Sequence, residues 1–333
     1  MRKLLIAAIV LIAGWCAYWV IGAGTNERAI AQWIEDRSVE GWQAESRSVD
    51  TTGFPVGFNT RISEPLFADP RTGVAFSAQS LTIESRALSP THLTATLSPT
   101  AQIATPYQQI DLSHEGAVAQ LFVDSGPRLT LDHTSGELQN AQLASSLGWG
   151  ATLAGAQFST QRRSDSPLTH DIDLTMTDFA PSDGMMSQLD PDGLLADRFE
   201  RFEATMAVTF ERPWDITALE GPRPQPRRIE ISKIAATWGK LDLQMAGLLD
   251  VDEAGTPSGK LAIKAANWRE MVDLAAAAGV IPADLVGIAR QAGGLLAGMS
   301  GKSDTIDADL TLRDGMIVLG FIPIAPAPKI VIR

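Results

Sequence analysis

Alternating apolar and polar residues recur along the chain, and this period of two restricts the fold more than any other feature of the sequence. Successive side chains of a β-strand point to opposite faces, so the alternation indicates strands with one dry and one wet face. Parallel strands are usually apolar on both faces, and the pattern therefore favours antiparallel pairing. We expect a mainly β fold of antiparallel, curved or groove-forming sheets. The clearest segments are 171–176, 202–210, 241–245 and 306–312, with weaker ones at 81–84, 93–97 and 229–231.

Short polar segments between these stretches predict the hairpins that antiparallel strands need. Asp314-Gly315 lies between two strand-like runs and is a strong signal for a tight two-residue turn. Residues 252–259 predict a looser hairpin loop, and segment 69–73 predicts a further turn.

Helices are few in this sequence. Residues 27–39 predict a short amphipathic helix that continues the apolar N-terminal segment. Segments near 267–279 and 282–296 predict a helical hairpin, because Asn267 and Glu270 form a capping box and Gly279 can end the first helix.

The N-terminus predicts a membrane-spanning helix. Residues 4–24 carry no charge and match the roughly 20 residues that cross a bilayer as a helix. Arg2 and Lys3 favour a cytoplasmic N-terminus, and the aromatic residues at 15, 18 and 19 suit the outer interface. We expect residues 1–24 to anchor a single-pass inner-membrane protein whose bulk is periplasmic. A cleaved signal peptide with its site at 22–24 is the alternative.

The Pro- and Arg-rich segment 221–228 predicts a linker or a long crossing loop. It divides the chain beyond the anchor into two β-rich units. The expected units are 25–220 and 229–333, with the helical hairpin in the second.

Charge and cysteine content exclude several classes of function. The chain has 27 Lys and Arg against 39 Asp and Glu, a net charge of −12, which argues against a nucleic-acid partner. Its one cysteine, Cys16, permits no internal disulfide and no zinc ribbon. Gly301-Lys302-Ser303 lacks the first glycine of a phosphate-binding loop, and segment 250–261 lacks the glutamate of a calcium loop.

The histidines also fail to form a motif. His114, His133 and His170 each adjoin an acidic residue, but neighbours in a strand face opposite ways, and His92 stands apart. No metal-ligand or nucleophile-elbow spacing occurs. The sequence therefore predicts no catalytic residue, no metal site and no cofactor, and a protein that is not an enzyme.

A set of turn glycines, prolines and tryptophans, with some of their neighbours, is spread along the chain. It consists of Gly53, Phe54, Pro55, Trp238, Gly239, Gly247, Asp250, Gly259, Trp268, Asp314, Gly315, Pro323, Pro326 and Pro328. In its order, this set resembles the proteobacterial family catalogued as domain of unknown function 2125. The resemblance covers nearly the whole region after the anchor. Residues 57 and 58 depart from it, since a polar or basic residue is expected there.

That family name supplies no activity, but an anchor followed by β-rich repeats is also similar to the AsmA-like envelope proteins. This wider similarity implies a periplasmic β-groove that contacts or conducts lipid. A sheet with one apolar face must bury that face, and this sequence predicts few helices that could cover it. Our leading hypothesis is a non-enzymatic envelope protein whose groove contacts lipid. The alternatives are a scaffold that binds another envelope protein by edge-strand pairing and, third, an envelope hydrolase.

The C-terminal segment 321–333 should not form a central strand, because its three prolines cannot donate to a sheet ladder. We expect it at a sheet edge or extended across the sheet's end. There it either closes the core, or guards the mouth of an apolar groove or docks a partner.

Overall fold

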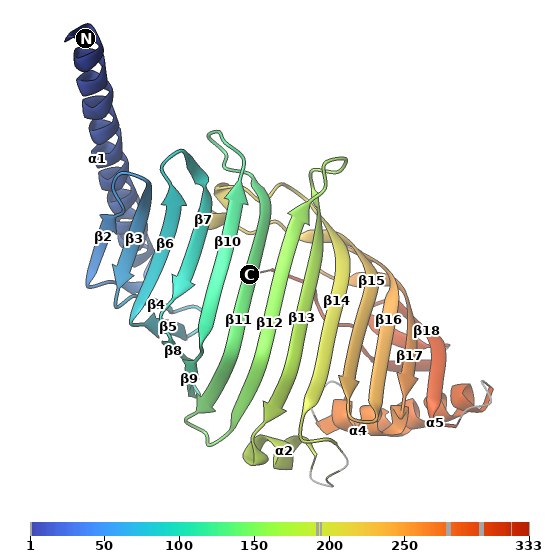
Figure 1. Ribbon diagram of the computed structural model, residues 1–333. Coiled ribbons are helices and arrows are strands. Elements are labelled where there is room, and N and C mark those ends of the chain that lie inside the picture. The colour runs from blue at the N-terminus through green and yellow to red at the C-terminus, as the bar shows by residue number, and fades with distance from the viewer. Residues whose placement is uncertain are drawn as a thin grey trace. The chain divides into compact units, whose positions relative to one another are not determined.

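The computed structural model describes residues 2–190, 193, 195–277, 281–299, 303–320 and 322–332, and it is mainly β, with 53% of residues in strands and 21% in helices. The strands of the described residues pair antiparallel (Figure 1). The predicted antiparallel, mainly β fold is confirmed. The chain forms two compact units, residues 1–123 with 137–148 and residues 124–136 with 149–333.

The first unit begins with one long helix, α1 (Arg2–Val39). The predicted anchor and the predicted helix at 27–39 are therefore parts of a single helix, because no proline interrupts the chain between them. In the described part of the chain, α1 is the one helix long and apolar enough to cross a membrane.

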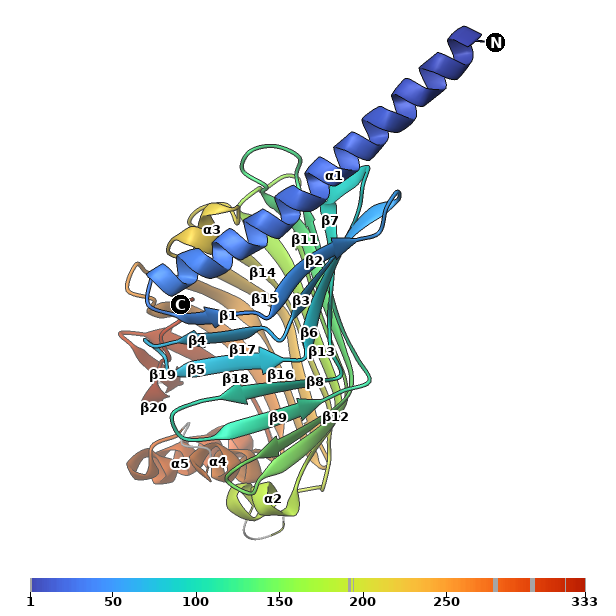
Figure 2. The same ribbon diagram turned by 90° about the vertical axis from the view of Figure 1, so that its left-hand side faces the viewer.

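Two sets of strands complete the first unit (Figure 2). One set pairs in the order β2-β3-β6-β7-β10, and the other in the order β1-β4-β5-β8-β9-β11. Between β3 and β4 the chain turns at Glu64, which has a φ of 49°, and at the fully buried Pro65. The strands are β1 (Gln43–Glu45), β2 (Ser48–Thr52), β3 (Gly57–Ser63), β4 (Leu66–Asp69), β5 (Val74–Ala78), β6 (Ser80–Arg86), β7 (Ser89–Leu97), β8 (Thr100–Ala104), β9 (Gln109–Ser113), β10 (Gly116–Val123) and β11 (Leu131–Ser145), whose first residues belong to the second unit.

The second unit is an antiparallel meander in which each strand from β12 to β20 pairs with the next (Figure 1). Its strands are β12 (Gly150–Arg162), β13 (Thr169–Pro181), β14 (Phe199–Phe210), β15 (Pro226–Trp238), β16 (Leu241–Val251), β17 (Pro257–Ala266), β18 (Thr305–Arg313), β19 (Met316–Leu319) and β20 (Ile322–Pro326). Its helices are α2 (Asp183–Leu189), α3 (Thr217–Glu220), α4 (Trp268–Ala277) and α5 (Ala283–Met299).

Most local predictions match these elements. Asp314 and Gly315 have φ values of 53° and 72° and join β18 to β19, as a tight hairpin requires. The helices predicted near 267–279 and 282–296 are α4 and α5. Gly279, the expected end of the first helix, lies outside the described residues.

The predicted linker 221–228 differs from what the structure contains. Its last three residues begin β15, and β15 pairs with both β14 and β16. Pro226 is tolerated there because the first residue of a strand need not donate a ladder hydrogen bond. Both sides of the segment consequently lie in the second unit.

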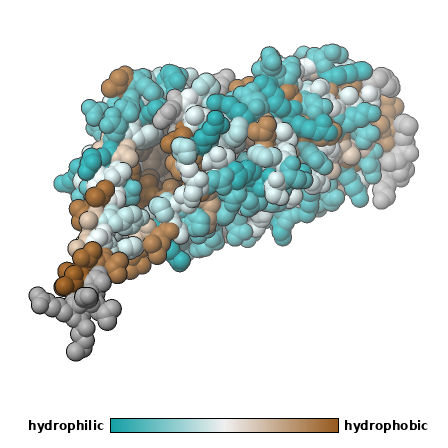
Figure 3. All heavy atoms as spheres, turned by 90° about the horizontal axis from the view of Figure 1, so that it is seen from above, coloured by the Kyte–Doolittle hydropathy of each residue, from teal (hydrophilic) through white to brown (hydrophobic). Residues whose placement is uncertain are grey.

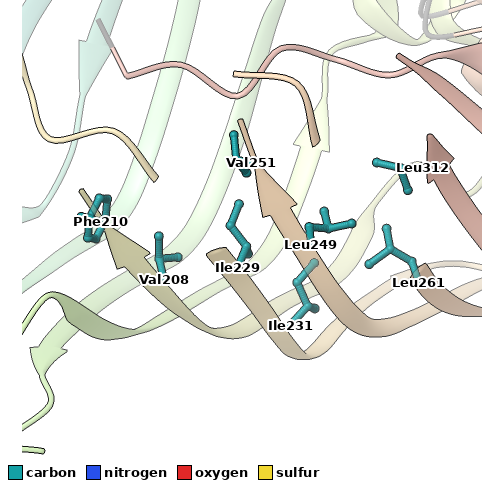
Figure 4. Close-up of a cluster of buried hydrophobic side chains, with 8 residues drawn as sticks. All are labelled: Val208, Phe210, Ile229, Ile231, Leu249, Val251, Leu261 and Leu312. Carbon is teal, nitrogen blue, oxygen red and sulfur yellow. The ribbon is translucent and has the colours of Figure 1, made fainter. Parts of the chain in front are cut away.

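The core of the second unit lies on one face of this sheet. Figure 4 shows eight side chains of one buried cluster, carried by β14 to β18. They alternate along each strand with residues of the opposite face, as the period of two predicts. The cluster consists of Val208, Phe210, Ile229, Ile231, Leu249, Val251, Leu261 and Leu312.

Candidate functional site

The apolar face of the second unit continues beyond its buried cluster as a band of half-buried side chains. Cross-strand pairing puts Ile172 beside Met206, Ile234 beside Met245, and Met245 beside Ile263. All five are only partly buried, in contrast to the cluster in Figure 4. This band, which we call the apolar band, consists of Ile172, Leu174, Met206, Ile234, Met245, Ile263 and Leu310.

The C-terminal segment covers one end of the apolar face. Ala327, Ile330 and Ile332 pack against the buried cluster. The backbone N–H of Ile330 donates to the carbonyl of Gly255 at 2.8 Å. The side chain of Gln225 both donates to the carbonyl of Ile332, at 2.7 Å, and accepts from its N–H, at 2.9 Å. β20 pairs with β19 and then gives way to this extended crossing segment, which agrees with the predicted edge position.

The helical hairpin covers the other end. Trp268 of α4 is almost fully buried and packs with Ala265, Ala297 and Ile306. Its indole N–H donates to the carbonyl of Ser303 at 3.1 Å. On α5, a Cβ at Gly293 would come within 2.4 Å of the Trp268 ring, so the small residue lets the helix approach the indole. An Arg290–Asp273 ion pair joins the two helices.

Between these two covers the apolar band keeps part of its surface accessible. The band extends toward β12, where Phe158 pairs with Leu174 and is 39% exposed. An exposed large apolar side chain in line with other half-buried ones is the kind of surface that binds an apolar ligand or partner.

The opposite face of the same strands is polar. Lys233 on β15 pairs with Glu203 on β14, and this hydrogen bond lowers the pKa of the Glu203 carboxyl. Arg163 pairs with Asp171, which lies on the face opposite to its neighbour His170. The second unit therefore presents one apolar and one charged surface.

A second apolar surface lies where α1 meets the loop between β2 and β3. Three ring donors of α1 reach backbone carbonyls of the first unit. The indole N–H of Trp15 donates to Pro55 at 3.1 Å, the hydroxyl of Tyr18 donates to Ala87 at 2.6 Å, and the indole N–H of Trp19 donates to Gly57 at 2.8 Å.

Aromatic packing closes this junction. Phe58 stacks on Trp19 at a centroid distance of 6.0 Å and meets Tyr18 edge-on. A Cβ at Gly22 would lie 2.6 Å from the Phe58 ring, so α1 needs a small residue there. Gly22 and the buried Ala23 thus have a packing role, independent of the cleavage-site pattern that they also fit.

The first unit also has an open polar depression of about 440 Å³ over β2, β3, β6 and β7. Asp50, Asn59, Arg61 and Glu84 line it, and the Asn59 amide donates to Glu84 at 2.9 Å. Its polar side chains are exposed and hydrogen-bond to one another, as is usual on a solvated face of a sheet.

The histidines occupy separate environments. His170 is buried beside Thr160, with 3.2 Å between Nδ1 and the hydroxyl, and burial and then the charge of Arg162 lower the pKa of its imidazole. His133 lies 2.9 Å from Asp132. His114 is 7% exposed, and neither ring nitrogen has a hydrogen-bond partner. The described residues contain no group of three side chains suited to hold a metal ion.

The residues of the sequence resemblance divide between the two units. Gly53, Phe54 and Pro55 form the loop against α1, where Gly53 has a φ of 105° and a Cβ would lie 2.9 Å from the Gly57 carbonyl oxygen. The others belong to the second unit, and several shape its hairpins and covers. They are Trp238 and Gly239 at the β15–β16 turn, Gly247, Asp250 and Gly259 in β16 and β17, Trp268 in α4, Asp314 and Gly315 in a turn, Pro323 and Pro326 in β20, and Pro328 after it.

Gly247 and Gly259 act together at the β16–β17 pair. A Cβ on Gly247 would lie 2.2 Å from the carbonyl oxygen of Lys260, and one on Gly259 would lie 2.1 Å from that of Leu248. Only glycine permits this approach of the two strands.

The family model described as "Uncharacterized protein conserved in bacteria (DUF2125)" matches residues 19–328, which is most of the chain. The chain belongs to the DUF2125 family. The DUF2125 match starts at Trp19, so it includes the apolar band and the loop against α1, but not Trp15 and Tyr18. Neither a curated protein nor a solved structure matches the chain. The more distant similarity to AsmA-like proteins stays a prediction.

Sequence reasoning missed the contacts between α1 and the loop. The aromatic residues at 15, 18 and 19 were expected at the membrane interface, and the structure gives their polar atoms protein partners. The signal was present, because Trp and Tyr inside an apolar run carry N–H and O–H donors that need acceptors. The carbonyl groups that accept these hydrogen bonds are distant in the sequence, so no local pattern identifies them.

Proposed function

We propose that this protein is a non-enzymatic, inner-membrane-anchored periplasmic protein that binds a lipid acyl chain on the apolar band of its second unit. The observation that carries this proposal is the half-buried band itself. Its two ends are covered by α4, α5 and the C-terminal segment, while its middle keeps apolar side chains accessible.

An acyl chain suits such a band physically. The band presents aliphatic and thioether side chains from neighbouring antiparallel strands, and methionine adapts readily to irregular apolar ligands. A methylene group that is fully removed from water contributes about 0.8 kcal/mol, and one that rests on an accessible band contributes part of this. A chain that covers several strands would therefore bind without any polar recognition.

The N-terminal helix supports the location. α1 is long and apolar enough to span a membrane, and Arg2 and Lys3 favour a cytoplasmic N-terminus. A protein anchored in this way has a lipid source beside it. Figure 3 shows hydrophobic residues gathered on this helix.

The scaffold alternative needs a free sheet edge. β2 pairs with β3, but the backbone N–H of Thr51 in β2 donates to Glu27 of α1 at 2.7 Å, so α1 occupies part of that edge. At the other end, β20 pairs with β19. Pro323 and Pro326 lie in β20 and cannot donate to an added strand, which weakens this edge as a template. Edge-strand binding of another envelope protein thus has less support than lipid binding.

The test measures lipid retained by the full-length protein. Met245→Trp fills the apolar band with a larger apolar side chain, whereas Gln244→Trp puts the same side chain on the polar face of the same strand. Both variants and the parent are purified in one mild detergent, and the acyl lipids that copurify are quantified by mass spectrometry. We expect Met245→Trp to retain less lipid and Gln244→Trp to match the parent. Equal retention in all three would refute binding at the band.

A further inference from the structure

The exposed side chains around the α1 junction point to a second membrane contact. Phe54, Val56 and Leu88 are large and apolar, yet 53%, 74% and 82% exposed, respectively. All three belong to the two loops whose carbonyls accept the ring donors of Trp15, Tyr18 and Trp19. We call residues 53–57 and 87–88 the wedge loops.

The height of these loops along α1 follows from helix geometry. A helix rises 1.5 Å per residue, so Trp15 lies about 17 Å and Trp19 about 23 Å beyond Leu4. A span that begins at Leu4 reaches the roughly 30 Å of a hydrocarbon layer near Ala23. The loops bonded to Trp15 and Trp19 therefore lie at the level of the outer half of that layer, and a moderate tilt of the helix places them slightly deeper.

Several backbone groups of the wedge loops meet the condition that lipid imposes. Inside a bilayer a polar backbone group must find its partner within the protein. The carbonyls of Pro55, Gly57 and Ala87 accept bonds from the α1 rings, and the N–H groups of Val56 and Gly57 both donate to Gly53. The N–H of Ala87 donates in turn to the carbonyl of Val56 at 3.0 Å, which links the two loops.

We infer that the wedge loops insert into the outer leaflet beside α1, with Phe54, Val56 and Leu88 in contact with lipid acyl chains. This inference rests on the proposed membrane anchoring by α1 and adds a second contact to it. Lipid would then cover the exposed apolar side chains of the wedge loops, and the first unit would contact the membrane together with α1.

The experiment places an environment-sensitive fluorophore on single cysteines in the full-length protein, with Cys16→Ser as background. The labelled variants are Ile12→Cys in α1, Val56→Cys and Leu88→Cys in the wedge loops, and Tyr107→Cys at the β8–β9 turn. Tyr107 is a matched control, because its side chain is exposed and belongs to the same unit. Figure 2 shows β8 and β9, which this turn joins, away from the N-terminal half of α1. The proteins are reconstituted into vesicles whose lipids carry a nitroxide on the acyl chain, which quenches only fluorophores in the hydrocarbon.

We expect quenching at positions 12, 56 and 88, and none at position 107. Quenching at 12 without quenching at 56 and 88 would overturn the wedge while leaving the anchor intact. Fluorophores at 56 and 88 that are shielded from water but not quenched would also overturn it, because a second copy of this protein would then cover the loops. Absence of quenching at all four positions would refute the anchor together with the wedge, whereas retention of lipid at the apolar band is measured separately.

Discussion

Leu310→Asp tests whether the apolar face of β18 is the dry face of the fold. Leu310 pairs with Leu261 and Leu319 across the sheet and is half-buried, while its neighbour Asp309 points to the opposite, exposed face. Burying a leucine fully contributes about 1.5 to 3 kcal/mol, so a half-buried one contributes roughly half of that. An unpaired carboxylate on this face adds a further cost, and we expect a total loss of about 2 to 4 kcal/mol.

The assay is denaturant unfolding of the full-length protein in detergent, with Asp309→Asn as the matched control. Asp309→Asn should change the free energy of unfolding by less than about 0.5 kcal/mol, because its side chain is solvated. The new carboxylate of Leu310→Asp should have a raised pKa in the folded state. Its destabilisation is then greatest at neutral pH and shrinks as the pH falls through that pKa. Equal effects of the two substitutions, or no loss at Leu310, would refute the one-sided sheet.

Three further predictions concern the covers and the buried histidine. Deleting residues 323–333 should lower the melting temperature or cause aggregation, since the segment packs on the buried cluster. A truncated protein with an unchanged melting transition and altered lipid retention would instead show that the segment controls access to the apolar band. Trp268→Ala should destabilise the protein by about 3 to 5 kcal/mol in the same unfolding assay, and an effect below about 1 kcal/mol would show that α4 does not cover the sheet. Because burial lowers the pKa of His170 from 6.5, the unfolded chain binds more protons below that pH. Stability should therefore fall as the pH drops through 6.5, and His170→Gln should flatten this dependence; an equally steep profile in the variant would exclude His170 as its cause.

The strands and hairpins of the second unit were predictable because their signals are local. Alternation at 202–210 and 306–312 and the Asp314-Gly315 turn each depend on a few consecutive residues, and the structure has β14, β18 and a tight turn there. The prediction of a linker over the whole segment 221–228 also depended on local residues alone. Pro226 at the start of a strand resembles a proline in a loop.

The candidate sites were less accessible to sequence reasoning. The apolar band depends on which side chains the C-terminal segment and the helical hairpin leave uncovered. The C-terminal segment is held by hydrogen bonds between residues as distant in the sequence as Gln225 and Ile332. The junction at Trp19 depends likewise on a carbonyl 38 residues away. Such contacts are set by tertiary packing, which the period of two does not encode.

Photocrosslinking with a lipid that carries a photoreactive group on its acyl chain tests lipid binding most directly. The full-length protein is irradiated in vesicles that contain this lipid, and the crosslinked residues are mapped by peptide mass spectrometry. Binding at the apolar band predicts crosslinks at Leu174, Met206 and Met245, reduced in Met245→Trp and unchanged in Gln244→Trp. Crosslinks confined to α1 and the wedge loops would contradict it, because they would show that the protein meets lipid only where it contacts the bilayer.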